Sequence, residues 1–446
     1  MRSNPPKDYS LAVSTGGPHL RENTIRAKAR LLLVTVICGW GLFSLTGYAT
    51  FSPSSQASEP KHNLSPQAMA MTTMKMSIVS AYNTFGFELF RHLVGQDQDQ
   101  NIFASPFSVA TALAMTYNGA AGETALAMGH TLGLTGMSLA QVNQASAALF
   151  KDLRSSDPRV QLDIANSLWA RQGIEFTPDF LERNRQFFGA TITALDFRDP
   201  QCTATINHWV DTQTQGKIKQ IVGQIAPDTV MLLINAVYFK GKWQVEFDKK
   251  LTRDDIFHLL DGTQKKVAMM SQSGRYPYYQ GERFQAVSLP YGEGPTSLYL
   301  FLPDQGTPLK EFFKQLNDQN WDGWLTRFRP MQGSIKLPRF QLEYDRQLNE
   351  ALKALGMTIA FDRDRADFSR MRVERDLFIQ QVKHKAIVEV NEEGTEASAA
   401  TSVGIGITSV LTPKPFTFVA NRPFFMAIRD ERTGTILFMG AVMEPK

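Results

Sequence analysis

The sequence predicts an α+β fold built as a single domain of about 380 residues. Apolar residues recur with helical spacing in the first part of the chain, whereas segments with strand-like patterns dominate after Val230. Hydrophobic residues make up 43% and charged residues 20% of the 446 positions, which is ordinary for a globular protein and excludes a disordered chain. No internal repeat and no second linker interrupts this region, so we expect one domain.

The expected helices lie mainly before residue 190. The spacing of Ile78, Tyr82 and Phe85, continued by later apolar residues, predicts a helix over residues 77–93. Ser105 and Pro106 predict the start of a second helix, because a hydroxyl caps the first turn and proline suits the first helical position. The other elements expected in this half are a strand over 101–104, Ala-rich helices up to about residue 153, a strand over 160–170 and a helix over 178–188.

The expected strands follow. Residues 231–239 form a nearly continuous apolar run, which is typical of a strand that is covered on both faces. A helix over residues 346–355 is expected to end at Gly356. The remaining expected strands are 287–290, 298–302, 334–344, 387–390, 416–419, 424–429 and 436–443.

The charge of the chain is concentrated at its beginning. Residues 1–30 hold six basic and two acidic side chains and so account for the whole net charge of +4, which leaves the body balanced and gives no support for nucleic-acid binding. Residues 31–49 are uncharged and apolar, a pattern typical of an export signal or of an uncleaved membrane anchor. We therefore expect a signal peptide or anchor over 1–49, a linker over 50–70 and the folded domain over 71–446. The protein would then be secreted or periplasmic, or held in a membrane by residues 31–49.

Signatures of common enzymes are missing from the sequence. It contains no nucleophile elbow, no zinc-protease motif, no phosphate-binding loop and no dinucleotide fingerprint. Its seven histidines are not spaced as metal ligands, and its two cysteines, Cys38 and Cys202, cannot build a disulfide framework. We expect no catalytic residues, no metal site and no cofactor, although a hydrolase with a site assembled from distant residues stays open as an alternative.

The most unusual segment of the body is residues 397–413, in which seventeen successive positions carry no charge. Laid out as a strand, this region has one face of small and apolar side chains, formed by Thr395, Ala397, Ala399, Thr401, Val403 and Ile405. The segment therefore has the composition of a surface loop and the alternation of a half-buried strand. Two interpretations follow, a surface loop or a conditional strand that enters an existing sheet.

Several motifs resemble those of the serpins, the serine protease inhibitors. The residues that carry this resemblance are Asn101–Ser108, Asn118–Thr124, Asn235–Trp243, Val390–Ala397 and Phe418–Ile428, and they occur in the order typical of the family. The resemblance covers nearly all of residues 77–446. It implies a serpin fold with N-terminal helices, a large central mixed sheet that accepts a reactive loop of about residues 392–415, and smaller additional sheets.

The resemblance also implies a function without turnover. A serpin offers its loop to a serine protease, is cleaved, forms a covalent acyl-enzyme and inserts the loop into the central sheet, which traps and distorts the protease. Such a protein is a suicide inhibitor and not an enzyme, and we expect it to be a monomer whose partner is the target protease. A non-inhibitory serpin that acts as a carrier or chaperone-like binding protein is the alternative.

Individual residues match positions of the family. The hinge of the reactive loop would be formed by Glu392, Glu393, Gly394, Thr395, Glu396, Ala397, Ser398, Ala399, Ala400 and Thr401. The region where the central sheet parts would contain Ser105, Ser108, Asn235 and His384. The point at which the loop enters the sheet would contain Trp243, Arg339 and Glu392.

The target follows from the residues around the cleaved bond. Fourteen residues beyond Gly394, the resemblance places this bond at Thr408–Ser409, with the neighbouring bonds on either side left open. No Arg or Lys lies between Glu396 and Lys414, which disfavours a trypsin-like target. An elastase-like or subtilisin-like serine protease is therefore expected, and a papain-like cysteine protease is an alternative.

Overall fold

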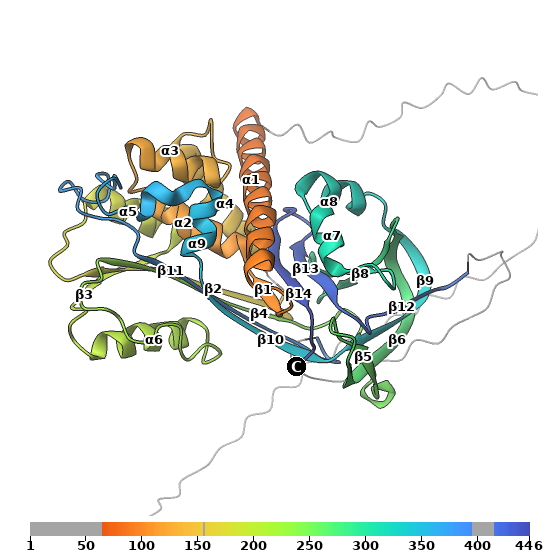
Figure 1. Cartoon of the computed structure of the whole chain (residues 1–446). Helices are drawn as coiled ribbons and strands as arrows, with labels where there is room; N and C mark the ends of the chain where they lie inside the picture. The colour runs from red at the N-terminus through yellow and green to blue at the C-terminus, as the bar shows by residue number, and fades with distance from the viewer. Residues whose placement is uncertain (1–64, 155–156, 395–413) are drawn as a thin grey trace, which may run out of the picture. The chain divides into compact units, whose positions relative to one another are not determined.

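The computed structural model describes residues 65–154, 157–394 and 414–446. Contacts divide the chain into residues 1–62 and 63–446, and the account below concerns the second unit. The helices of this unit lie largely on one face of a long twisted sheet, and helix α6 lies on the opposite face (Figure 1). The unit has the α+β architecture that the sequence predicts.

The first helices show which local signals decide a boundary. Helix α1 (Pro66–Gln96) begins eleven residues before the predicted start and inside the predicted linker, where the hydroxyl of Ser65 caps it by accepting from the amide of Ala68. Helix α2 (Pro106–Tyr117) begins where predicted, with the Ser105 hydroxyl accepting from the amide of Ser108. The other α-helices that the structure describes are α3 (Gly122–Thr131), α4 (Leu139–Leu153), α5 (Pro178–Phe188), α6 (Gln201–Gln213), α7 (Leu309–Gln315), α8 (Asp318–Leu325) and α9 (Asn349–Leu352).

The strands among the described residues form two sheets. The five-stranded sheet has the order β10 (Phe340–Gln347), β11 (Gln381–Val390), β4 (Met231–Gly241), β2 (Val160–Arg171) and β3 (Thr191–Leu195). The nine-stranded sheet contains β1 (Ile102–Ala104), β14 (Ile436–Val442), β13 (Phe424–Asp430), β8 (Thr296–Pro303), β7 (Phe284–Pro290), β6 (Gln264–Gln280), β9 (Arg329–Pro338), β12 (Phe416–Val419) and, paired with β6, β5 (Arg253–His258). In the five-stranded sheet, β11 and β4 are parallel neighbours, with His384 opposite Asn235.

One predicted strand was wrong. Residues 334–344 belong to two separate strands, β9 and β10, which lie in different sheets. Arg339 lies between them, and its amide donates to the carbonyl of Ala268. The apolar positions change phase at this point, from Ile335 and Leu337 to Phe340 and Leu342, and the prediction overlooked this local sign that one strand ends and another begins. The predicted helix over 346–355 was also displaced, since Arg346 and Gln347 complete β10 and the helix begins at Asn349.

Strand β4 is covered on both faces, as its apolar run predicts. Leu233, Val237 and Phe239 belong to the main core, on the face covered by helix α2. The alternate residues, Leu232 and Ile234, join a smaller cluster that includes Ile206 and Val210 of helix α6. Hydrophobic burial on two faces holds β4 in place, and the strand can therefore form one side of a functional opening in the sheet.

Candidate functional site

A buried polar cluster lies at the boundary between β4 and β11, beside the beginning of helix α2. We call Ser105, Ser108, Asn235 and His384 the sheet-opening cluster, and each is at most 1% exposed. His384 Nδ1 lies 2.5 Å from Asn235 Oδ1, and both hydrogens of the Asn235 amide are used, one toward Ser108 Oγ and one toward Asn166 Oδ1 of β2. The cluster therefore joins three strands to the beginning of α2.

The protonation state of His384 follows from its partners. The backbone amide of Ser105 donates to His384 Nε2 at 3.2 Å, so this nitrogen must be an acceptor without a proton. The neutral ring then carries its proton on Nδ1 and donates it to Asn235 Oδ1. Complete burial lowers the pKa of His384 to about 3, because a charged ring would lose its hydration and would direct a second N–H toward the Ser105 amide. His384 is thus a neutral structural link between β11 and α2.

β4 and β11 pair with each other along the N-terminal part of both strands. The pairs run from Gln381–Leu232 to Ile387–Tyr238. In the described chain no pair joins residues 388–390 of β11 to residues 239–241 of β4, although both strands continue. The pairing between β4 and β11 therefore stops before either strand ends.

The turn after β11 lies at this end of the seam between β4 and β11. Gly394 forms antiparallel bridges to Lys242, just beyond β4, and to Asn391, just beyond β11. Its φ of +106° is unfavourable for residues with a side chain, and a Cβ atom would lie 2.2 Å from the carbonyl oxygen of Gly241. Only glycine fits at this position, so the hinge can lie this close to the end of β4.

Trp243 forms hydrogen bonds with the same turn. Its indole N–H donates to the carbonyl of Asn391, and its backbone amide donates to the carbonyl of Glu393. The ring stacks on Tyr291 at a centroid distance of 4.5 Å, and the next anchor is the Phe247 amide, which donates to the carbonyl of Glu392. These contacts hold Glu392 and Glu393 against the segment that follows β4.

Both glutamates of the turn are buried, with exposed fractions of 4% for Glu392 and 6% for Glu393. Glu392 accepts from the Thr252 hydroxyl at 2.7 Å and forms an ion pair of 3.5 Å with Arg339 Nε. Glu393 forms an ion pair through Oε1 with Lys249 of the short 3₁₀ helix η1 (Lys249–Leu251). The structure thus brings together Trp243, Arg339 and Glu392, the three residues expected where the loop enters the sheet.

Sequence reasoning missed several partners in this region. Asn166, Lys249 and Thr252 lie in segments whose local pattern gives no functional signal, and only the tertiary structure places them here. The expected hinge residues Thr395–Thr401 and the expected bond Thr408–Ser409 lie outside the described residues.

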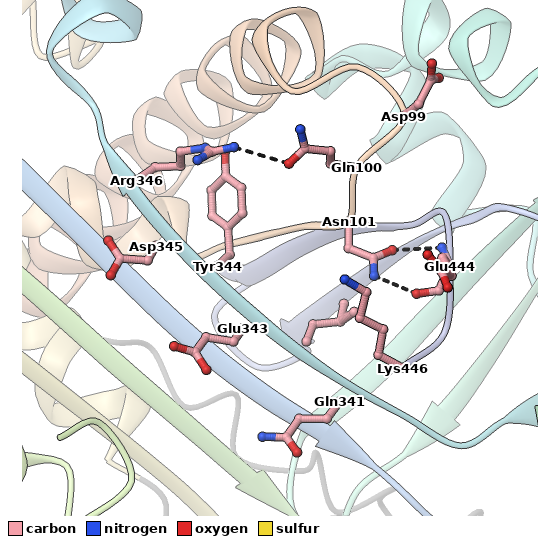
Figure 2. Close-up of a pocket in the computed structure, with 11 residues that line it drawn as sticks. Asp99, Gln100, Asn101, Gln341, Glu343, Tyr344, Asp345, Arg346, Glu444 and Lys446 are labelled. Atoms are coloured by element: carbon pink, nitrogen blue, oxygen red, sulfur yellow. Dashed lines mark hydrogen bonds between the residues drawn. The ribbon is translucent and has the colours of Figure 1, made fainter. Parts of the chain in front are cut away.

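A pocket of about 760 Å³ lies elsewhere, beside the edge strand β10 (Figure 2). Its lining is polar, and the Asn101 side chain holds the backbone of Glu444 there. It contains none of the residues of the sheet-opening cluster or of the turn. The described residues contain no group of three or more His, Cys, Asp or Glu side chains that could hold a metal ion.

These features define an α+β domain with a large mixed sheet, a buried polar cluster between two parallel strands and a glycine turn at the end of the same two strands. Residues 80–445 match the family described as Serpin (serine protease inhibitor). The chain belongs to the serpin family.

Individual relatives agree with this assignment. Human Serpin B8 is 36% identical over 377 residues, which are 82% of this chain and 99% of that protein. The bovine leukocyte elastase inhibitor is 37% identical over 386 residues, which are 83% of this chain and 100% of that protein. The solved structure of the thermophilic serpin Tengpin in the native state has a TM-score of 0.76 and 33% identity, and the match covers 82% of this chain and 94% of that chain. Relatives are thus named as protease inhibitors, and serpins are inhibitors and not catalysts.

The prediction that the protein is exported, or anchored by residues 31–49, was wrong. Serpin B8 and leukocyte elastase inhibitor are clade B serpins, which are known as intracellular proteins. The prediction depended on the composition of a segment outside the described residues, and an apolar run after basic residues is not unique to export signals. Within the described ranges, no helix is long and apolar enough to span a bilayer.

Proposed function

We propose that this chain is a suicide inhibitor of serine proteases whose reactive loop, once cleaved, inserts between β4 and β11. The observation that carries the proposal is the register of Gly394. Its bridges to Lys242 and to Asn391 are both antiparallel, so each residue that follows Gly394 would step down β4 and β11 together.

The two bridges agree with each other along the whole seam. The two bridges can be continued from Gly394 along β4 and along β11. Both then place the same loop residue between each pair of facing residues of the two strands. For example, Thr401 is assigned to the space between His384 and Asn235, which now face each other. Since the two registers were set by different strands, this agreement supports a hinge that is already aligned for insertion.

The faces of the inserted strand also agree with the sequence pattern. Directly opposed residues of an antiparallel pair point to the same side of a sheet. Ala397 would lie beside Val388 and Phe239, which are both fully buried, and Thr401 would lie beside His384. Small uncharged side chains would therefore enter the core, and Glu396 would point to the other face, together with Glu389 and Lys240.

The insertion would exchange one polar contact for another. The backbone of Thr401 would separate His384 from Asn235 and break the hydrogen bond between Nδ1 and Oδ1. The hydroxyl of Thr401 can accept from the ring N–H and donate to the amide oxygen, so both buried groups would keep a partner. The sheet-opening cluster is consistent with this role because it is buried, polar and placed at the seam.

The chemistry before insertion is that of the acyl-enzyme. The serine oxygen of the protease attacks the carbonyl carbon of Thr408, the bond to Ser409 breaks, and the new amino group of Ser409 takes up a proton. Hydrolysis of the ester then competes with insertion of the loop. The uncharged residues around Thr408 favour an elastase-like or subtilisin-like protease, and leukocyte elastase inhibitors among the relatives agree with the first of these. We propose that the protein acts as a monomer and forms a covalent complex.

The test combines two charge substitutions on opposite faces of the loop. Ala397→Glu would place a carboxylate in the core, so we expect the protein to be cleaved like a substrate without forming a complex. Glu396→Lys exchanges one charge for another on the opposite face, beside the exposed Glu389, and should leave inhibition intact. The measurement is an SDS-stable band at the summed mass after incubation with elastase. Equal amounts of this complex for both variants would refute the proposed insertion, and clean cleavage of the unmodified chain would favour the carrier function.

A further inference from the structure

Glu393 has an unsatisfied oxygen in a buried position. Its Oε1 is paired with Lys249, whereas Oε2 has no hydrogen-bond partner among the described residues and no contact with solvent. A buried carboxylate oxygen without a donor is unfavourable, because the water that it has lost is not replaced. This oxygen therefore needs a donor close to the turn that precedes Gly394.

Glu246 is the neighbouring group that can supply one. It is half-buried, its carbonyl accepts from the Gln272 side chain, and the next residue, Phe247, donates to the carbonyl of Glu392. Burial, and next the negative charge of Glu393, raise the pKa of Glu246. Repulsion between two carboxylates in a partly buried site favours a state in which one of them holds a proton.

The other charges around Glu246 come from separate elements. Lys242 follows β4 and Lys249 lies in η1, and both lower the pKa of Glu246 less than burial and Glu393 raise it. Glu392 acts on Lys249 and is paired with Arg339, which lies between β9 and β10. The two cations therefore reduce the repulsion between Glu246 and Glu393 without removing it.

We propose that Glu246 is a positioning residue for loop insertion, which in its protonated form donates to Oε2 of Glu393 and so holds the turn before Gly394 in register with β4. The link to the register is the amide of Trp243, which donates to the carbonyl of Glu393. When Glu246 is ionised, repulsion loosens the turn. When it is protonated, the turn is held and insertion gains over hydrolysis of the acyl-enzyme.

This inference rests on the proposed function for its consequence, namely that inhibition becomes more efficient at mildly acidic pH. The quantity to measure is the number of inhibitor molecules cleaved for each protease molecule trapped, between pH 7.5 and pH 5. In the unmodified chain we expect this number to fall on the order of threefold as the pH is lowered, the factor expected for one partly buried charge interaction. Glu246→Gln donates an amide N–H at every pH and should keep the low value throughout.

Two further variants sharpen the comparison. Glu393→Gln removes the charge that Glu246 opposes and should also abolish the pH dependence. Glu282→Gln removes an exposed carboxylate at the turn between β6 and β7 and should behave like the unmodified chain. An identical pH dependence in the unmodified chain and in Glu246→Gln would overturn the inference, even if covalent complexes form normally.

A second measurement does not depend on inhibition. A carboxyl with a raised pKa in the folded protein contributes stability at low pH and loses it as the pH rises through its unfolded and then its folded pKa. The thermal midpoint of the unmodified chain, relative to that of Glu246→Gln, should therefore rise as the pH is lowered. A constant difference would contradict the inference. Absence of a covalent complex at every pH would instead count against the proposed function alone.

Discussion

The neutral state of His384 leads to a prediction with a defined size and sign. The folded protein holds this ring unprotonated down to a pKa of about 3, whereas the unfolded chain binds a proton at the ordinary pKa of about 6.5. Below pH 6.5, unfolding therefore takes up a proton, and the stability that comes from the neutral ring is lost as the pH falls. Linkage over this window gives a loss of about 2 kcal/mol between pH 7 and pH 5 from this residue.

The assay is denaturant-induced unfolding of the native protein at several pH values. His384→Gln cannot titrate, so its stability should be lower at pH 7 but should fall less between pH 7 and pH 5, by about 2 kcal/mol. His208→Gln, at an exposed position of α6, serves as the matched control and should follow the unmodified chain. If His384→Gln and the unmodified chain lose the same stability over this range, the ring is not a neutral acceptor for the Ser105 amide, and the argument fails.

Two further substitutions test the hinge and the cap of α2. Gly394→Ala would combine a φ of +106° with a Cβ atom 2.2 Å from the Gly241 carbonyl oxygen, so we expect it to reduce complex formation with elastase. The control is Gly216→Ala, at a position with a positive φ and open space around it, which should form the complex normally. Equal inhibition by both variants would contradict the steric argument. Ser105→Ala removes the acceptor for the Ser108 amide and a donor to the Leu437 carbonyl, so it should lower the free energy of unfolding by about 1–3 kcal/mol. The control is Ser138→Ala at the exposed cap of α4, which should lower the free energy of unfolding by about 1 kcal/mol. Equal losses would show that burial of the Ser105 cap adds no stability.

Part of the fold could be predicted because its signals are local. The capping hydroxyl of Ser105 and the following proline marked the start of α2, and the apolar run of β4 indicated burial on both faces. The division of residues 334–344 was missed although the apolar positions change phase between Leu337 and Phe340, and only the structure shows that the two strands lie in different sheets. The early start of α1 was missed because residues 66–76, in which Met and Ala predominate, are largely exposed in the helix and show no clear apolar period.

The candidate site divides in the same way. The motif around Gly394 and the matching positions of Asn235 and His384 could be named from the sequence. Their partners, Asn166 of β2 and Lys249 of η1, came from the structure, because hydrogen bonds and ion pairs between distant segments depend on register and packing.

The sequence by itself determined the α+β class, the family motifs and the uncharged segment suited to enter a sheet, because these properties depend on the order and chemistry of neighbouring residues. Only the tertiary structure shows the seam at which we propose that such a strand enters. The matching registers of Gly394 against Lys242 and Asn391, the neutral state of His384 and the unsatisfied oxygen of Glu393 all arise from contacts between segments far apart in the chain. Burial makes these contacts consequential, since a buried polar group that loses its partner has no water to replace it.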